Sequence, residues 1–518
     1  MAVVVSVGEG SLEGSEDRGV RRFLGIPYAA PPVAGLRLRS PRRHPGWSGT
    51  RPAVAYGPAA PQKLAGMQTW LNDPPPGFDE DCLVLNVWAP AGATAAPVLV
   101  WFHGGATRAG HGGAAAIAGE RLARKQGIIV VTVNYRLGPL GGLAHPDLAD
   151  DGTGHAANWG MQDKIAALEW VQRSISAFGG DPAAVTVAGQ SSGGTNAILI
   201  AQNPDCAGLF HRIIAMSPPF FRPPMFVGIE AAAEYTEALA ELCGTTVRGL
   251  RDVDGSELVK RELAFIGQSD FARRFGRPRT APTLDGRLVR DWPYDRPMAP
   301  VPLLIGFTRD EARFWYDLKL PDGTVLTSMK PPVDRAELDA ELQRLVRLYY
   351  AFDRPPSAAD VVAAHGGAEP LPDEAARIWF EAYSDILFRA PLLHYAARHA
   401  QSAPTYVYES AWPLAAPASG TPHAADVPFV FGNAGHPYIA AKIGYGRDAA
   451  ALEQATMDAF ASFVRTGQPG VTGWRPVSAD DRPAAMVATF GDAGHVVSVG
   501  PLKRIPSFEL WRAYDPRG

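Results

Sequence analysis

Short, continuous runs of apolar residues recur along the chain, and most end in glycine or in polar residues. Such runs fit strands that are buried on both faces, as in a mainly parallel sheet. They lie at residues 98–102, 128–133, 185–188, 213–216, 301–305 and 406–408. The apolar residues 1–7 are too few for a signal sequence, and we interpret them as an edge strand. The pattern therefore predicts a central, mostly parallel sheet.

Helical spacing appears between these runs. Apolar residues recur every three or four positions at Ile165, Leu168, Val171, Ile175 and Phe178, so we expect a helix that covers the sheet. Residues 336–350, 374–400 and 452–466 also predict helices, the last one ended by Gly467 and Pro469. This alternation of strands and helices predicts an α/β fold.

Composition restricts the class of protein. The chain has 518 residues, of which 46% are hydrophobic and 20% charged, which is enough for a large core. Glycine and proline are spread evenly and no linker or repeat appears, so we expect one domain over residues 1–518, although length alone suggests roughly three. The net charge of −4 argues against a nucleic-acid partner, and no apolar run is long enough to cross a membrane.

The three cysteines, Cys82, Cys206 and Cys243, are an odd number without the spacing of a metal site. We therefore expect no disulfide framework and a cytoplasmic location. The twelve histidines are scattered, and neither H-E-x-x-H nor paired C-x-x-C motifs occur, so we expect no metal and no cofactor.

One predicted strand, 185–188, runs into the segment Gly189-Gln190-Ser191-Ser192-Gly193, and a helix-compatible stretch, 196–201, follows. This strand–turn–helix context is where the pattern G-x-S-x-G forms a nucleophile elbow, a tight turn that holds a strained, reactive serine. Only Ser191 has glycines at both required positions, and Ser192 would offer its backbone N–H to an oxyanion. The pattern indicates a serine hydrolase.

Further segments carry distinctive motifs in order along most of the chain. They are Phe23-Leu24-Gly25-Ile26-Pro27-Tyr28-Ala29, Pro31-Pro32-Val33, Gly35-Leu36-Arg37, Trp47-Ser48-Gly49, Tyr56-Gly57-Pro58, Glu80-Asp81-Cys82-Leu83-Val84-Leu85-Asn86-Val87, Asn134-Tyr135-Arg136-Leu137-Gly138 and Phe178-Gly179-Gly180-Asp181-Pro182. With the elbow, they resemble the type-B carboxylesterase/lipase family, relatives of the cholinesterases. The resemblance implies an α/β-hydrolase fold, with a central, mostly parallel sheet covered by helices.

The resemblance also implies a Ser–Glu–His triad in that chain order. The acid of the family lies in an Asp-Glu-Gly segment just past a strand, and Asp310-Glu311-Ala312 matches it with alanine in place of glycine. Glu311 is the expected acid, and Asp310 is the nearer alternative. The histidine of the family precedes a Phe-Val-Phe-Gly stretch, which resembles residues 429–432, so the resemblance implies His423 as the base.

These residue types suit ester hydrolysis. A serine hydroxyl is a poor nucleophile until a base removes its proton, and histidine can do this near neutral pH and then protonate the leaving alcohol. The glutamate would hold the imidazole in the right tautomer. Backbone N–H groups of Gly104 and Gly105, which follow His103 at a predicted strand end, would stabilise the oxyanion together with that of Ser192.

The family implies roles for further positions. Ser217 stands where the family has a serine that hydrogen-bonds near the triad acid, although Pro218 replaces the glycine that follows it there. Two buried ion pairs are also implied, between Arg37 and Glu80 and between Arg136 and Asp163. We expect these pairs to be structural.

The chain departs from the family in the loop 61–81. Many members close this loop with a disulfide to the cysteine that matches Cys82, but Ala60 stands where the partner is expected. Trp70 lies in this loop, where cholinesterases place a cation-binding tryptophan, yet its distance to Cys82 does not match without a gap. We expect Trp70 to be a packing or surface residue.

Aromatic residues follow the expected positions of Ser217 and Glu311. They are Phe220, Phe221 and Phe226 after the serine, and Phe314, Trp315 and Tyr316 after the glutamate. We expect at least half to pack in the core and some of the others to line an apolar pocket that favours neutral esters over choline esters.

The sequence thus predicts a cytoplasmic carboxylesterase that hydrolyses small to medium neutral esters through an acyl-serine intermediate. Its expected partner is a small-molecule ester, and we expect a monomer or weak homodimer. A hydrolase of carbamates or of a larger natural-product ester is the closest alternative, since the same triad serves all of them. A silent, neuroligin-like binding protein and a lipase with a large lid are less favoured, because the triad residues are intact and no strongly apolar lid segment is visible.

Overall fold

The structure is a computed structural model that describes residues 1–219, 226–292, 296–327, 329–349, 356–366, 374–415, 420–478, 486–492, 494–502 and 510. Its contacts divide the chain into a first unit, residues 1–213 and 225–299, and a second unit, residues 214–224 and 300–518. The expectation of one domain over residues 1–518 stays a prediction.

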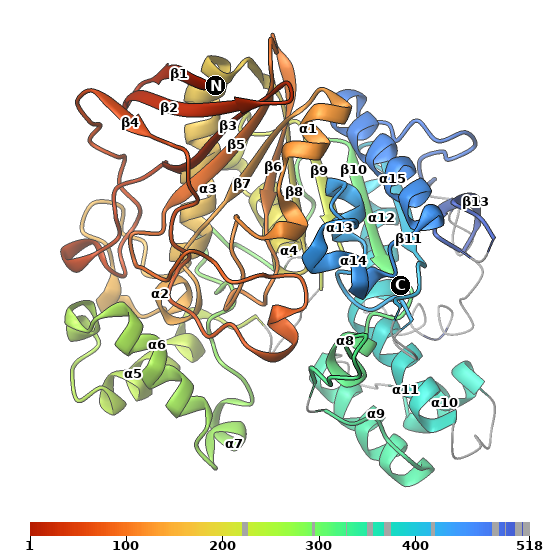
Figure 1. Cartoon of the computed structure of the whole chain (residues 1–518). Coiled ribbons are helices and arrows are strands. Elements are labelled where there is room, and N and C mark those ends of the chain that lie inside the picture. Colours follow the sequence, from red (N-terminus) through yellow and green to blue (C-terminus); the bar gives the residue numbers. More distant parts are fainter. Residues whose placement is uncertain are drawn as a thin grey trace. The chain divides into compact units, whose positions relative to one another are not determined.

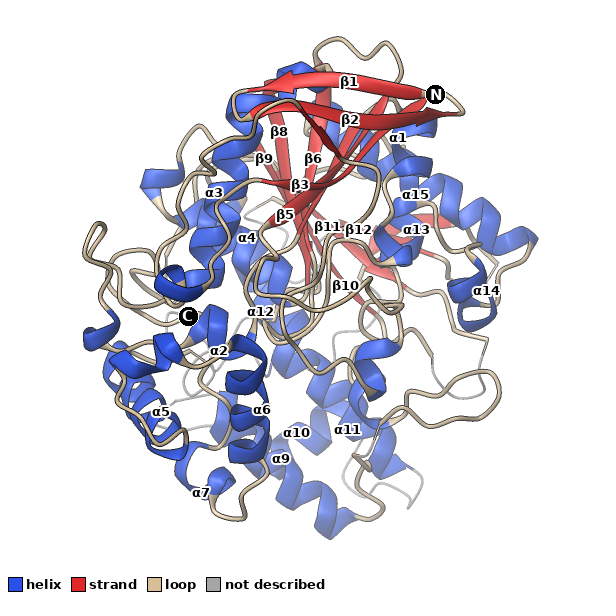
Figure 2. Cartoon of the chain, turned by 60° about the vertical axis from the view of Figure 1, so that its left-hand side comes forward, coloured by secondary structure: helices blue, strands red, loops and turns tan. Residues whose placement is uncertain are grey.

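The first unit contains a sheet of parallel and antiparallel strands (Figures 1 and 2). Along the sheet the strands follow the order β1 (Ala2–Val7), β2 (Gly10–Asp17), β3 (Val20–Pro27), β5 (Val84–Pro90), β7 (Ile129–Val133), β6 (Ala96–Phe102) and β8 (Gly180–Gln190), and β4 (Thr50–Pro52) pairs with β2. Pairing is antiparallel from β1 to β7 and parallel between β7, β6 and β8.

The burial of each strand explains whether its residues form a continuous apolar run and could be predicted from the sequence. Every residue of β7 is buried, and so are the last five residues of β6, which matches the expected runs at 128–133 and 98–102. The predicted edge strand is β1, which pairs with β2 alone. Strands β2 and β3 mix buried and exposed positions, so they carry no continuous apolar run.

Helices pack on these strands: α1 (Glu120–Gln126) on β3, β5 and β7, and α3 (Trp159–Ser174) and α4 (Ser192–Gln202) on β8. The predicted helix at 165–178 is α3 and the short 3-10 helix η5 (Ile175–Phe178). A second layer consists of α2 (Gly138–Gly142), α5 (Ile229–Leu242), α6 (Gly255–Ile266) and α7 (Phe271–Phe275), which share an apolar cluster centred on Tyr235. The remaining 3-10 turns are η1 (Ala34–Leu36), η2 (Gly66–Thr69), η3 (Ala115–Ile117), η4 (Pro146–Leu148), η6 (Pro204–Cys206) and η7 (Arg248–Asp252).

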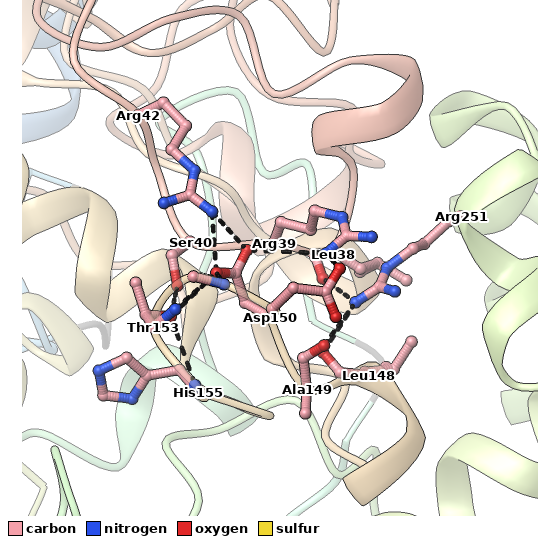
Figure 3. Close-up of polar contacts among 12 residues, drawn as sticks. Leu38, Arg39, Ser40, Arg42, Leu148, Ala149, Asp150, Thr153, His155 and Arg251 are labelled. Atoms are coloured by element: carbon pink, nitrogen blue, oxygen red, sulfur yellow. Dashed lines mark hydrogen bonds and ion pairs between the residues drawn. The ribbon is translucent and has the colours of Figure 1, made fainter.

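A polar network around Asp150 fastens two loops of this unit (Figure 3). The buried carboxylate accepts hydrogen bonds from the backbone N–H groups of Gly152 (3.0 Å) and Thr153 (2.9 Å) and from the guanidinium of Arg42 (2.9 Å). The Arg251 guanidinium donates to the carbonyl oxygen of Leu148 (2.8 Å). The network holds the chain near residue 40 against the loop around residue 150, because buried polar groups are stable only when paired.

Further strands belong to the second unit. Strands β10 (Leu303–Thr308), β11 (Thr405–Ser410) and β12 (Met486–Phe490) are parallel, and β13 (Val497–Pro501) pairs antiparallel with β12; β9 (Arg212–Met216) runs from the first unit into the second. Its helices are α8 (Arg313–Tyr316), α9 (Arg335–Tyr349), α10 (Ala358–Gly366), α11 (Glu374–Ser384), α12 (Ala390–His399), α13 (Val427–Phe431), α14 (Pro437–Ile443) and α15 (Arg447–Thr466). Helices α9, α10 and α11 share an apolar core around Trp379.

The helix predicted at 374–400 is not a single α-helix. A π-helical turn, η8 (Asp385–Arg389), separates α11 from α12. Pro391 lies in the first turn of α12, and proline has no N–H to donate to the carbonyl one turn earlier, so the hydrogen-bond register shifts there. The helices predicted at 336–350 and 452–466 correspond to α9 and α15, and Gly467 ends α15 with a φ of 76°.

Candidate active site

Ser191 lies at a sharp turn between β8 and α4. Its φ of 56° and ψ of −129° are unusual for a residue with a side chain, and such strain is concentrated at functional sites. The carbonyl oxygen of Ser191 accepts the N–H of Thr195 at 3.0 Å, which starts the helix directly after the turn. Its side chain is partly exposed, whereas that of Ser192 is buried. The predicted strand–turn–helix arrangement is therefore present.

The two glycines of the turn have no room for a side chain. A Cβ at Gly189 would lie 2.4 Å from the carbonyl carbon of Gly193, and a Cβ at Gly193 would lie 2.1 Å from the carbonyl oxygen of Phe102. Real Cβ atoms do not approach backbone atoms so closely. The sequence pattern thus reflects a close approach between the turn and the end of β6.

The expected oxyanion donors lie beside this turn, after β6. Gly105 has a φ of 111°, and a Cβ there would lie 2.0 Å from the carbonyl oxygen of Ala109. A Cβ at Gly104 would lie 3.1 Å from that of Ser191. The backbone N–H of Thr107 donates to Ser192 Oγ at 3.2 Å. Ser192 therefore links α4 to the loop that carries Gly104 and Gly105, which we call the glycine loop. This side-chain role of Ser192 was not predicted.

His103 and Tyr135 hold the start of the glycine loop. The Tyr135 hydroxyl donates to the carbonyl oxygen of His103 at 2.6 Å, and the two rings stack with centroids 4.3 Å apart. The His103 ring bonds through Nδ1 to the carbonyl oxygen of Gly104 at 2.8 Å. Burial lowers the pKa of His103 to about 3, so this ring is neutral and supports the backbone.

The second unit brings Glu311 and His423 together. Both side chains are buried, and His423 Nδ1 donates to Glu311 Oε2 at 2.5 Å. The other carboxylate oxygen, Oε1, accepts the backbone N–H of Thr308, the last residue of β10, at 2.8 Å. The glutamate is therefore fixed by the strand end and presents one oxygen to the imidazole, as the family's triad requires.

Asp310 is engaged elsewhere. Its Oδ2 accepts the backbone N–H of Thr421 at 2.9 Å, and its own N–H donates to the carbonyl oxygen of Thr421 at 3.0 Å. These bonds tie the loop after β10 to the loop that carries His423. In the described part of the chain, His423 is thus hydrogen-bonded to Glu311, whereas the carboxylate of Asp310 bonds to Thr421.

Aromatic side chains surround the imidazole of His423. Its ring centroid lies 5.6 Å from that of Phe314, 5.0 Å from Trp315 and 5.1 Å from Phe388. Phe314 and Trp315 are half-buried, while Tyr316 is buried in the core. Phe388 belongs to the π-helical turn, and the sequence analysis missed it because a π turn has no signature in the apolar pattern. Phe220 and Phe221 lie outside the described residues, and Phe226 is buried.

Asp426 is a second buried carboxyl near His423 that the sequence analysis did not identify. Its Oδ2 accepts the hydroxyl of Tyr408 at 2.8 Å, and its Oδ1 has no hydrogen-bond partner among the residues that the structure describes. Burial raises the pKa of Asp426 to about 6, and the neighbouring charge of Glu311 adds to the rise. Gly306 makes room for this arrangement, because a Cβ there would lie 2.2 Å from the Tyr408 ring.

Ser217 lies just after β9 and is fully buried. Its φ of 42° is unusual, and its N–H donates to the carbonyl oxygen of Gly306 at 2.7 Å. Among the residues that the structure describes, the side-chain oxygen has no hydrogen-bond partner, and the role expected for Ser217 near the triad acid stays a prediction.

The two ion pairs expected in the first unit are present. Arg37 and Glu80 form a bidentate pair with two contacts of 2.6 Å, and the buried Arg136 and Asp163 are joined by contacts of 2.7 and 2.8 Å. Trp70 is 2% exposed and thus packs inside. Cys82 and the other two cysteines are free thiols. Among the residues that the structure describes, no group of three or more His, Cys, Asp or Glu side chains is arranged to hold a metal.

No helix in the described part of the chain is both long and apolar enough to cross a membrane.

Comparisons with known proteins identify the family of the chain. A model of the carboxylesterase family matches residues 2–492. The chain is 33% identical to phenmedipham hydrolase of Pseudarthrobacter oxydans, over 94% of this chain and 95% of the relative, and 31% identical to para-nitrobenzyl esterase of Bacillus subtilis strain 168, over 90% of each. The solved structure of a para-nitrobenzyl esterase matches with a TM-score of 0.78 and 28% identity, over 99% of each chain. The chain therefore belongs to the carboxylesterase family, has the α/β-hydrolase fold, and is a type-B carboxylesterase related to hydrolases of esters and carbamates.

Proposed function

We propose that the chain hydrolyses small to medium neutral carboxylic esters by nucleophilic catalysis at Ser191. His423 removes the proton from Ser191 Oγ as the oxygen attacks the ester carbonyl, and it then protonates the leaving alkoxide. Water, activated by the same histidine, releases the acid from the acyl-serine and restores the enzyme. Glu311 keeps the imidazole in the tautomer that accepts this proton and stabilises the imidazolium.

The observation that carries the proposal is the buried hydrogen bond of 2.5 Å between His423 and Glu311. A buried carboxylate on Nδ1 leaves Nε2 as the proton acceptor, which is the arrangement a serine nucleophile needs. The strained Ser191 between two obligatory glycines supports the other half of the site. The backbone N–H groups of Gly104, Gly105 and Ser192 are the proposed oxyanion donors, and Ser217 is the proposed supporting residue near Glu311.

The reaction can be tested with 4-nitrophenyl esters of increasing acyl length and a fluorophosphonate probe. We expect turnover of the short esters and covalent phosphonylation of Ser191, located by peptide mass spectrometry. Labelling of another serine would overturn the assignment of the nucleophile. A folded protein that neither turns over the esters nor reacts with the probe would instead support the silent binding-protein alternative.

Carbamate hydrolysis is a second candidate, favoured by the 33% identity to phenmedipham hydrolase along nearly the whole of both chains. Aryl carbamates should be included beside the esters at matched leaving groups. A higher kcat/KM for the carbamate than for the matched ester would make carbamates the proposed substrate class.

Location and assembly also remain proposals. We propose a cytoplasmic monomer or weak homodimer, supported by the three free cysteines. Cell fractionation and light scattering of the purified chain test the two statements separately.

A further inference from the structure

Lys164 of α3 is buried near the glycine loop. Only 2% of the residue is exposed. Its Nζ donates to the carbonyl oxygen of Gly160 at 2.9 Å and lies 3.3 Å from the centroid of the Tyr135 ring, on the face of the tyrosine. One N–H of the Lys164 ammonium is used in the hydrogen bond, and the charge takes part in one cation–π interaction. The ammonium can therefore donate further hydrogen bonds.

The charges around Lys164 do not balance. Arg136 is neutralised by Asp163, and Arg108 is neutralised by Glu262 through contacts of 2.7 and 3.0 Å. His103, on the far side of Tyr135, is neutral. Among the described residues, Lys164 forms no ion pair of its own. Burial lowers the pKa of Lys164 to about 7, since a buried ammonium is costly, and the charge of Asp163, which pairs with Arg136, offsets only part of this shift.

A cavity of about 20 Å³ lies against Lys164. This volume exceeds the roughly 10–15 Å³ that one water molecule needs, so it fits one water-sized or slightly larger particle. Asn196 of α4 also lines the cavity; the residue is 1% exposed, and its Nδ2 has no hydrogen-bond partner within the described ranges of the chain. The cavity wall thus combines an uncompensated cation with a buried amide donor, and Arg136 adds a second, already paired, cation.

We propose that this cavity is a binding site for one monovalent anion of halide size, held between the ammonium of Lys164 and the amide of Asn196. The anion supplies the missing counter-charge and the missing hydrogen-bond acceptor together. It binds the protonated lysine only, so binding and protonation are linked. No step of the proposed ester hydrolysis uses the site, and its test does not depend on activity.

Chloride and bromide are the probes. We would follow the line width of ³⁵Cl in the NMR spectrum of the purified chain at constant ionic strength, with gluconate as the replacement anion. We expect a saturable broadening at pH 6 that bromide displaces. The apparent affinity should fall about tenfold from pH 6 to pH 8, because the protonated fraction of a lysine with a pKa near 7 falls by about that factor.

Two variants locate the site. Lys164→Met should remove the saturable component, whereas Lys260→Met, at an exposed lysine of the same unit, should leave it unchanged. Asn196→Asp places a carboxylate beside the lysine, so it should also abolish halide binding while the chain stays folded. In crystals grown with bromide, anomalous scattering should place one ion between Lys164 and Asn196.

Loss of the saturable component in both cavity variants but not in Lys260→Met would support the site. Absence of saturable broadening in the unaltered chain would overturn it and identify the occupant as water. Equal broadening in the unaltered chain and a folded Lys164→Met or Asn196→Asp variant would overturn it as well, since the anion would then bind elsewhere.

Discussion

The two adjacent serines of the elbow differ in how their side chains are used. Ser191 is a partly exposed residue, whereas Ser192 is buried and its Oγ accepts the N–H of Thr107. We expect Ser191→Ala to lower kcat/KM for a nitrophenyl ester at least about 1,000-fold. Ser192→Ala keeps the backbone N–H and loses one hydrogen bond, so we expect a loss of about tenfold or less. Steady-state kinetics on both folded variants, monitored by circular dichroism, checks this; equal losses would contradict the assignment.

The roles of the two acids in the loop after β10 can be distinguished by substitution in the same way. Glu311→Gln removes the charge that orients His423, and we expect a loss of at least about 100-fold in kcat. Asp310→Asn changes the side chain that accepts the N–H of Thr421 and leaves the carboxylate on His423 in place, so we expect a loss below about tenfold. Pre-steady-state measurement of acyl-enzyme formation distinguishes the two. A larger loss in Asp310→Asn, with both proteins folded, would make Asp310 the acid.

The titration of Asp426, the buried carboxyl near His423, affects the free energy of unfolding. Its folded pKa of about 6 lies above the ordinary value of 3.8, so the folded chain holds this proton more tightly than the unfolded chain. The resulting stability is present below pH 4 and is lost as the pH rises through about 6. Asp426→Asn mimics the protonated form, and we expect it to raise the free energy of unfolding by up to about 3 kcal/mol at pH 8 and by little at pH 4.

Urea unfolding of Asp426→Asn and of the unaltered chain at pH 4 and pH 8 measures this difference. The control is Asp458→Asn at an exposed residue of α15. Its effect on the free energy of unfolding should not depend on pH in this way. A stabilisation that is equal at the two pH values would show that titration of Asp426 is not its cause.

At the scale of elements, the elbow depends on the contact between the turn after β8 and the end of β6. A methyl group at Gly193 would meet the carbonyl oxygen of Phe102 at 2.1 Å, and neither backbone can shift without disturbing the sheet. We expect Gly193→Ala to destabilise the chain by about 3 kcal/mol or more. Thermal unfolding checks this against Gly35→Ala, where an added Cβ meets no atom within 4 Å. Similar melting temperatures for the two variants would contradict the steric explanation.

The aromatic surroundings of His423 also depend on the shape of one helical element. The π-helical turn η8 directs Phe388 toward the imidazole, and Trp315 stacks on Phe388 with centroids 5.8 Å apart. A regular helix through Pro391 would place these residues in another register. The aromatic surroundings of the histidine therefore depend on an irregularity that proline introduces.

At the scale of the whole molecule, the surroundings of His423 bear on the substrate. Its ring is flanked by apolar aromatic groups, and Trp70, the counterpart considered for a cation-binding tryptophan, is buried. We expect neutral aryl or short alkyl esters to exceed choline esters of similar size at least about tenfold in kcat/KM, which requires only ~1.4 kcal/mol of differential transition-state binding. A preference for acetylcholine or butyrylcholine over the uncharged ester would contradict this expectation.

The sequence by itself determined the central strands, the elbow and the family. Strands such as β6 and β7 are recognisable because both of their faces are buried, and Gly189 and Gly193 are required because only hydrogen fits there. The choice between Asp310 and Glu311 needed the structure, because adjacent carboxylates have the same local pattern and only the loop conformation directs one of them to His423. Tertiary structure alone also revealed Phe388, Asp426 and the unbalanced charge of Lys164. Their roles depend on burial and on neighbours distant in sequence, which no local pattern of residues records.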